Sequence, residues 1–158
     1  MINNKLIAMD RLPVFFEQRL VVTNGCFDII HSGHVSYLSR ARELGDKLLV
    51  GLNSDESIRA LKGDGRPINS AEDRALVLSA FSFVDYICIF EEKKATNFLK
   101  AARPDVYVKA GDYSLETLDQ SEKCILDLCG SHIKFIPFEK GKSTTKILER
   151  LKNEKDER

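Results

Sequence analysis

The stretch Asn24-Gly25-Cys26-Phe27-Asp28-Ile29-Ile30-His31-Ser32-Gly33-His34 decides how this sequence folds. It follows the apolar run Leu20 to Thr23, which predicts a buried strand, and it leads into apolar residues at helical spacing. A strand that ends at Asn-Gly and continues into a helix is the first unit of an α/β fold. Unpaired N–H groups and the helix dipole at such a helix start favour an anion. We therefore expect an anion-binding loop within this stretch.

The rest of the chain repeats this alternation of apolar strands and amphipathic helices. The further predicted strands are 47–52, 84–90, 105–109 and 133–136, and the predicted helices are 35–44, 54–61, 70–80, 95–102, 115–128 and one that starts at Ser143. Because the strands are apolar on both faces, the sheet should be parallel and covered by helices on each side. The predicted fold class is α/β: a single Rossmann-like, doubly wound domain with a five-stranded parallel sheet. In such sheets ligands bind beyond the carboxyl ends of the strands, at the topological switch point.

The length of 158 residues fits one domain. We expect residues 1–18 to be an N-terminal extension, residues 19–151 to form the domain, and residues 152–158 to be a polar tail. The extension carries apolar side chains that offer one face for docking: Leu12, Phe15 and Phe16.

The charge balance excludes some classes of partner. Lys plus Arg number 24 and Asp plus Glu number 24, so the formal net charge is zero. A general affinity for nucleic acid or an anionic membrane needs a basic surplus, so neither is expected as a partner. Residues 1–11 lack the apolar region of a signal peptide, and no apolar run approaches the ~18 residues of a membrane span. We therefore expect a cytoplasmic protein.

The four cysteines are expected to be reduced thiols in a cytoplasm: Cys26, Cys88, Cys124 and Cys129. A zinc site can be built from Cys124, Cys129 and His132, but the spacing is not that of a CxxC knuckle. Two half-buried cysteines on a helix are the simpler interpretation. No metal ligand is therefore assigned to a protein side chain.

Two histidines, His31 and His34, stand three residues apart at the start of the first predicted helix. Gly25 and Gly33 allow the backbone to approach a phosphate closely. Imidazole N–H groups can donate to phosphate oxygens that gain charge during transfer. No side-chain nucleophile is needed if the substrate carries the attacking oxygen. The alternative is that the two histidines only cap the helix; a zinc site here is weak, because no further ligands stand nearby.

The segment Asn24–Asp28 followed by His31-Ser32-Gly33-His34 resembles the signature of the cytidylyltransferase-like HxGH nucleotidyltransferase superfamily. Within it, the chain is most similar to the heptose 1-phosphate adenylyltransferases of lipopolysaccharide and surface-glycan precursor synthesis. The segments that carry this closer similarity are 50–55, 66–69, 72–74, 108–113 and 143–145. The resemblance extends from about Leu20 to Leu151 and implies that residues 19–151 are a nucleotidyltransferase domain.

The resemblance implies roles for individual residues. Three would be catalytic: His31, His34 and Lys62. The nucleotide would be bound by Asn24, Gly25, Cys26, Phe27, Asp28, Gly33, Asn53, Arg74, Ser143, Thr144 and Thr145. The phosphorylated substrate would be bound by Lys109, Gly111 and Asp112. Some of these residues have structural alternatives: a helix-entry cap for Asp28, a solvated surface position for Lys62 and a surface salt bridge for Arg74.

The implied activity is transfer of AMP from ATP to a heptose 1-phosphate, which gives ADP-heptose and pyrophosphate. Mg²⁺ is expected together with ATP, because it neutralises the triphosphate and the leaving pyrophosphate. Relatives in the superfamily are often dimers, so the resemblance implies a homodimer. A separate sugar kinase would supply the sugar 1-phosphate.

Two departures from the family patterns leave the base and the substrate open. Gly141-Lys142 differs from the acidic-Gly pattern of glycerol-3-phosphate cytidylyltransferases, and Ala110 replaces a glycine common among heptose relatives. A cytidylyltransferase acting on glycerol 3-phosphate or another alcohol phosphate is the alternative enzyme. A non-catalytic nucleotide-binding regulatory module is the alternative from another class. A dehydrogenase-type domain is disfavoured because no GxGxxG follows the first strand.

Overall fold

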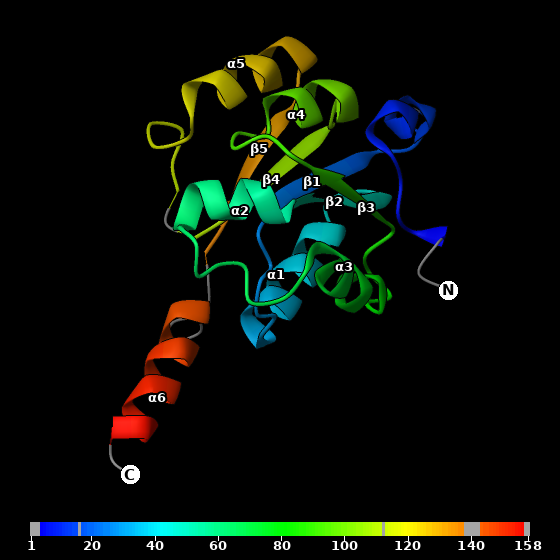
Figure 1. The fold of residues 1–158 in the computed structure, drawn as a ribbon. Coiled ribbons are helices and arrows are strands. Elements are labelled where there is room, and N and C mark those ends of the chain that lie inside the picture. Colours follow the sequence, from blue (N-terminus) through cyan, green and yellow to red (C-terminus); the bar gives the residue numbers. More distant parts are fainter. Residues whose placement is uncertain (1–3, 16, 112, 138–142, 157–158) are drawn as a thin grey trace.

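A central sheet with helices on both faces forms the body of the protein in the computed structural model (Figure 1). The structure describes residues 4–15, 17–111, 113–137 and 143–156. The strands are β1 (Leu20–Gly25), β2 (Lys47–Asn53), β3 (Tyr86–Phe90), β4 (Val106–Ala110) and β5 (His132–Ile136). Each neighbouring pair is parallel, and the order across the sheet is β3-β2-β1-β4-β5. The predicted five-stranded parallel sheet is confirmed.

Helices cover both faces of the sheet. The helices are α1 (Ser32–Arg42), α2 (Asp55–Lys62), α3 (Ala71–Ser79), α4 (Thr96–Ala102), α5 (Gln120–Cys129) and α6 (Thr144–Asp156), with a 3₁₀ helix at Met9–Phe15. Helices α1 and α3 share one apolar cluster with the sheet, and the 3₁₀ helix, α4 and α5 share the other. Figure 1 shows these two groups on opposite sides of the strands. The doubly wound arrangement that the sequence predicts is therefore confirmed.

Alternate residues of the central strands face opposite layers. In β2, Leu48 and Val50 belong to the cluster with α1 and α3, whereas Leu49 belongs to the cluster with α4 and α5; all three are fully buried. Gly51 lies in the same strand, and a Cβ atom there would come within 2.5 Å of the Phe98 ring on α4. The lack of a side chain at Gly51 therefore lets α4 lie close to the sheet.

The first residues of the described chain pack against the sheet. Ile7 N donates to Ile87 O (2.9 Å) and Ile87 N donates to Lys5 O (2.8 Å), so this segment lies along the outer edge of β3. Leu12 of the 3₁₀ helix is fully buried in the cluster with α4. The predicted docking through Leu12 is confirmed. Phe16 and the side chain of Phe15 lie outside the described residues.

The helix predicted at 115–128 is wrong at its start, because α5 begins at Gln120. Leu118 N donates to Ser114 O (3.0 Å), which closes a turn at residues 114–118. The Asp119 carboxylate then accepts hydrogen bonds from the backbone N–H groups of Ser121 and Glu122, as an N-cap residue does. Because of this turn and the cap at Asp119, the helix begins at Gln120 rather than at Leu115.

The strand predicted at 84–90 is also shorter than expected. Asp85 directs its carboxylate back to β2, where it accepts from Leu48 N (2.9 Å). It also pairs with Arg42 (2.8 Å) and Lys47 (3.1 Å). Leu48 N is thus bonded to a side chain rather than to a backbone carbonyl, although Asp85 N still donates to Leu48 O (3.1 Å), and the regular strand begins at Tyr86.

Helix α6 extends away from the sheet (Figure 1). Its start is capped as predicted, because Ser143 Oγ accepts from Lys146 N (3.2 Å). The helix continues to Asp156, so most of the stretch predicted as a polar tail is helical. No helix in the described part of the chain is both long enough and apolar enough to cross a bilayer.

Candidate active site

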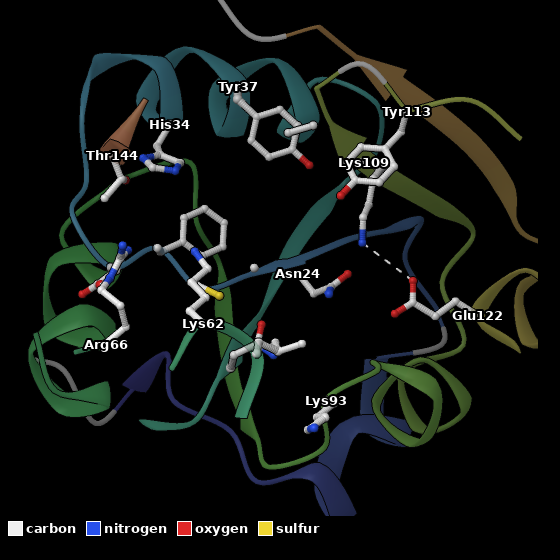
Figure 2. A pocket seen from close by; sticks show the side chains of 17 residues that line it. Asn24, His34, Tyr37, Lys62, Arg66, Lys93, Lys109, Tyr113, Glu122 and Thr144 are labelled. Carbon is white, nitrogen blue, oxygen red and sulfur yellow. Dashed lines mark hydrogen bonds and ion pairs between the residues drawn. The ribbon is translucent and has the colours of Figure 1, made fainter. Parts of the chain in front are cut away.

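A cavity of about 450 Å³ opens at the carboxyl ends of the central strands (Figure 2). Asn24 and Gly25 at the end of β1, Asn53 at the end of β2, and Lys109 at the end of β4 all line it. After β1 the chain adds β2 and β3 on one side of β1, and then returns to add β4 and β5 on the other side. The cavity therefore lies at the switch point, where ligands bind in folds of this kind.

His31 and His34 cap the first turn of α1 with one ring nitrogen each. Gly33 N donates to His31 Nδ1 (3.2 Å), and His31 N donates to His34 Nδ1 (3.4 Å). The two rings lie 4.0 Å apart between centroids. Because Nδ1 acts as an acceptor in both rings, a neutral imidazole at either position carries its proton on Nε2. Helix capping and donation to a ligand are thus compatible at these two residues.

His34 lines the cavity and is neutral near pH 7. Burial, together with the nearby His31 and Lys62, lowers the pKa of His34 to about 4. A neutral ring can donate through Nε2 without first taking a proton from solvent. His31 is not among the described residues that line the cavity, but its ring is a direct neighbour of the His34 ring.

The loop between β1 and α1 turns sharply at Phe27, whose φ is +47°. A bulky side chain rarely adopts this left-handed conformation, and it costs about 1–2 kcal/mol. The ring of Phe27 lies 5.3 Å from the ring of His34, and a Cβ atom at Gly25 would lie 3.1 Å from it. The turn thus places the Phe27 ring beside the His34 ring in a tilted arrangement, and Gly25 leaves room for it.

Asp28 holds the loop that follows α2. Arg66 Nε donates to Asp28 Oδ2 (2.5 Å), and the backbone N–H groups of Ile68 and Asn69 donate to Oδ1 at 2.8 and 3.0 Å. Burial alone would raise the pKa of Asp28, but the hydrogen bonds from Asn69, Arg66 and Ile68 outweigh it and lower the pKa. The carboxylate is charged and fully engaged by protein. These contacts hold residues 66–69 beside the cavity wall to which Asp28 belongs.

Arg74 has protein contacts in place of the phosphate contact that the sequence analysis expected. It is 2% exposed, and it donates to Cys26 O (2.7 Å), Asn53 O (2.8 Å) and Asn69 O (3.0 Å). Its remaining terminal nitrogen pairs with Asp55 (2.7 Å). One guanidinium group thus ties the end of β1, the end of β2 and the loop before α3 together. This contact set also replaces the surface salt bridge considered as the alternative.

Positive and hydroxyl-bearing residues gather on one side of the cavity. Lys62, the last residue of α2, lines it together with Arg66 and Thr144. Thr144 Oγ1 donates to Ile29 O (3.2 Å), which joins the start of α6 to the loop before α1. Figure 2 shows these side chains near His34. This side of the cavity is suited to a polyanion such as a triphosphate.

The opposite side of the cavity carries a chain of polar contacts. Tyr107 Oη donates to Asn24 Oδ1 (2.5 Å), and Lys109 Nζ donates to Tyr107 Oη (3.2 Å). Lys109 Nζ also lies 3.7 Å from Glu122 Oε2. Burial, together with the Glu122 carboxylate, raises the pKa of Tyr107 well above its usual value, so its hydroxyl keeps its proton.

The cavity brings most of the predicted site residues together, but not all of them. Those that line it are Asn24, Gly25, Cys26, Phe27, Asp28, His34, Asn53, Lys62, Lys109 and Thr144. Gly33 N is bonded to His31, Gly111 N donates to Ile136 O (3.0 Å), and Thr145 is exposed on α6. Asp112 lies outside the described residues, as does the pair Gly141-Lys142.

Seven lining residues were not assigned from the sequence: Tyr37, Leu61, Arg66, Lys93, Ala110, Tyr113 and Glu122. Three of them lie within the segments that carry the family resemblance, namely Arg66, Ala110 and Tyr113. The resemblance could therefore have indicated these three as site residues. Glu122 gave no signal, because a glutamate near the start of an amphipathic helix reads as a solvated surface charge. Its burial depends on α4 and β4, which the local sequence does not reveal.

No three His, Cys, Asp or Glu side chains in the described ranges lie close enough together to hold a metal ion. The zinc alternative at Cys124, Cys129 and His132 falls within these ranges and gains no support. Cys124 and His132 are exposed, and Cys129 is half-buried.

Comparison with known proteins places this geometry in a family. A family model described as cytidylyltransferase-like matches residues 22–150. The chain is similar to the bifunctional protein HldE of Campylobacter concisus, with 47% identity over 158 residues that cover 98% of this chain and 32% of that protein. It is similar to the HldE of Nitratiruptor, with 48% identity over 136 residues that cover 86% of this chain and 28% of that protein. The chain thus spans about a third of the length of these relatives.

A solved structure agrees with the family match. The lipopolysaccharide core biosynthesis protein from Thermoplasma volcanium superposes with a TM-score of 0.63 and 26% identity, covering 79% of this chain and 99% of that one. A pantoate-beta-alanine ligase from Francisella tularensis, at 13% identity and a TM-score of 0.55, shares the fold alone. The family model covers most of the chain, from the middle of β1 to α6. The chain belongs to the cytidylyltransferase-like family.

Proposed function

We propose that the protein is a nucleotidyltransferase that moves AMP from ATP to a heptose 1-phosphate and releases pyrophosphate. The observation that carries the proposal is the histidine pair, with His34 neutral and at the wall of a cavity at the switch point. Lys62, Arg66 and Thr144 surround the same side of the cavity. This arrangement supports binding of a triphosphate next to a preformed N–H donor.

The proposed reaction needs no protein nucleophile. A phosphate oxygen of the sugar 1-phosphate attacks the α-phosphorus of ATP, and the bond from the α-phosphorus to the oxygen of the β-phosphate breaks. The products are the ADP-sugar and pyrophosphate, so atoms and charge balance without an enzyme-bound intermediate. His34 would donate from Nε2 to a phosphate oxygen that gains charge, and Lys62 would approach the same oxygens as a point charge.

The heptose assignment rests on the similarity to HldE. Identities of 47% and 48% over most of this chain support a shared substrate class. Since the chain corresponds to about a third of a protein named bifunctional, it would carry one of two activities. A sugar kinase is proposed as the source of the sugar 1-phosphate. A homodimer and a cytoplasmic location are proposed with the activity.

Mg²⁺ would enter bound to the phosphates of ATP. The two carboxylates at the cavity, Asp28 and Glu122, each lie beside a cation of the protein, Arg66 and Lys109. The metal would neutralise the triphosphate and the pyrophosphate.

A pyrophosphate-release screen tests the proposal. We expect release with ATP and a heptose 1-phosphate, and poor release when CTP replaces ATP. The screen would cross ATP, CTP, GTP and UTP with a panel of sugar 1-phosphates and glycerol 3-phosphate. A clear preference for CTP with glycerol 3-phosphate would support the alternative cytidylyltransferase. Nucleotide binding without turnover on any substrate would support a regulatory module.

A further inference from the structure

We infer that Lys109 and Glu122 form a net-neutral pair that binds adjacent hydroxyl groups of a substrate sugar ring rather than a phosphate. The inference rests on the proposed function, because it assigns a chemical task to the other side of the same cavity. Figure 2 shows Lys109, Tyr113 and Glu122 on the side away from Lys62, Arg66 and Thr144. A sugar ring can come from the acceptor or from the ribose of ATP, and both carry adjacent hydroxyl groups.

The pairing of Lys109 with Glu122 argues against a phosphate at Lys109. Glu122 is 5% exposed, and its Oε1 accepts a hydrogen bond from Ala95 N (3.0 Å). Its Oε2 lies 3.7 Å from Lys109 Nζ. A buried carboxylate needs this positive partner, and a phosphate bound to Lys109 would compete for it while repelling Glu122. Lysine at the end of β4 is therefore already neutralised.

The remaining hydrogen-bonding capacity suits hydroxyl groups. Lys109 has three N–H donors, of which one goes to Tyr107 and one faces Glu122. Glu122 has lone pairs beyond those facing Ala95 and Lys109. The Asn24 amide nitrogen, in the same wall, has no partner among the described residues. A donor beside an acceptor matches two neighbouring hydroxyls, because each hydroxyl both donates and accepts.

The neighbouring side chains fix this pair in place. The Tyr107 hydroxyl, held protonated by its raised pKa, links Lys109 to Asn24 at the end of β1. Lys109 Nζ also lies 5.4 Å from the centroid of the Tyr113 ring, whose side chain is exposed at the mouth of the cavity. This ring offers an apolar face against which the C–H groups of a sugar can pack. Glu122 is thus a specificity-determining residue.

Glu122→Gln tests the inference, because glutamine keeps the shape and the acceptor for Ala95 N but loses the negative charge. Wild-type protein is expected to have a much lower kcat/KM for a deoxy analogue that lacks the bound hydroxyl. The polar groups that bind this hydroxyl would be left unpaired when the analogue binds. In Glu122→Gln this discrimination should fall about ten- to a hundredfold, as expected for a hydrogen bond to a charged group. The matched control is Glu116→Gln, an exposed glutamate outside the cavity.

Two sets of analogues identify the source of the hydroxyl groups. Deoxy sugar 1-phosphates report on the acceptor, and 2′-deoxy- and 3′-deoxy-ATP report on the ribose. A loss of discrimination in either set supports the inference and names the ring that is bound. Unchanged discrimination in both sets would overturn it. Strong competition by inorganic phosphate that Lys109→Met abolishes in otherwise wild-type protein would also overturn it, because Lys109 would then bind phosphate with Glu122 in place.

Two further measurements keep the test decisive if Glu122→Gln fails to fold. The double variant Lys109→Met/Glu122→Gln removes both charges together and is assayed with the same analogues. In wild-type protein alone, the absence of discrimination against every deoxy analogue contradicts the inference. The proposed function is tested separately, by the turnover of wild-type protein with ATP and a sugar 1-phosphate. The test of the inference instead compares the rates of normal and deoxy substrates on the same protein variant.

Discussion

Replacing His34 by alanine should lower kcat on the order of a hundredfold or more while nucleotide Kd changes by less than about tenfold. The proposed role of His34 is donation from Nε2 to an oxygen whose charge grows during transfer. Such a contact is stronger in the transition state than in the ground state, so its loss appears in turnover. His31→Ala should behave similarly, with more loss of nucleotide affinity if His31 contacts the outer phosphates.

His34→Asn is the matched control for the capping role. The asparagine oxygen can accept from His31 N as Nδ1 does now, but the variant has no distal N–H at the position of Nε2. We expect His34→Asn to keep the stability of wild type and to lose as much turnover as His34→Ala. Single-turnover experiments on the folded variants measure the rate of the chemical step, and calorimetry measures the nucleotide Kd. Near-normal turnover in His34→Asn would leave helix capping as the whole role of the residue.

Replacing Arg74 by methionine should lower the free energy of unfolding by about 3–5 kcal/mol. The guanidinium is buried, and three backbone carbonyls lose their donor with it: those of Cys26, Asn53 and Asn69. Arg74→Lys should recover only part of the loss, because an ammonium cannot reach carbonyls in three directions as the planar fork does.

Urea unfolding measures the effect of the Arg74 variants. Arg59→Met on α2 is the control, since Arg59 is an exposed cation and its loss should cost less than about 0.5 kcal/mol. A free energy of unfolding within 1 kcal/mol of wild type in Arg74→Met would show that the carbonyls find other donors, such as water. The residue would then be open again to a direct role in nucleotide binding.

The sheet and the position of the cavity follow from signals that are local in the sequence. Strands such as 47–52 are apolar on both faces, which predicts burial between two helical layers, and β2 is buried as expected. The turn at Asn24-Gly25 and the histidine spacing predict an anion site at the start of α1, and Asn24, Gly25 and His34 line the cavity. Such features need no knowledge of distant residues.

The contacts of Asp28, Arg74 and Glu122 depend on residues far away in the chain. Asp28 meets Arg66 across 38 positions, and Arg74 reaches Cys26 across 48 positions. From the sequence each reads as a charged residue near a helix start, which is most often solvated. The shorter α5 has a local cause instead: Asp119 is a better N-cap than the turn residues before it, and the apolar pattern of 115–118 hides that boundary.

The most direct test of the central claim is the fate of labelled oxygen. The enzyme would be given ATP and a sugar 1-phosphate whose non-bridging phosphate oxygens are ¹⁸O, and the products would be read by ³¹P NMR. If the substrate phosphate attacks the α-phosphorus of ATP, one ¹⁸O atom lies between the two phosphorus atoms of the ADP-sugar, and pyrophosphate carries no label. An unlabelled bridging oxygen, or label released in phosphate or pyrophosphate, would contradict nucleotidyl transfer to the sugar phosphate.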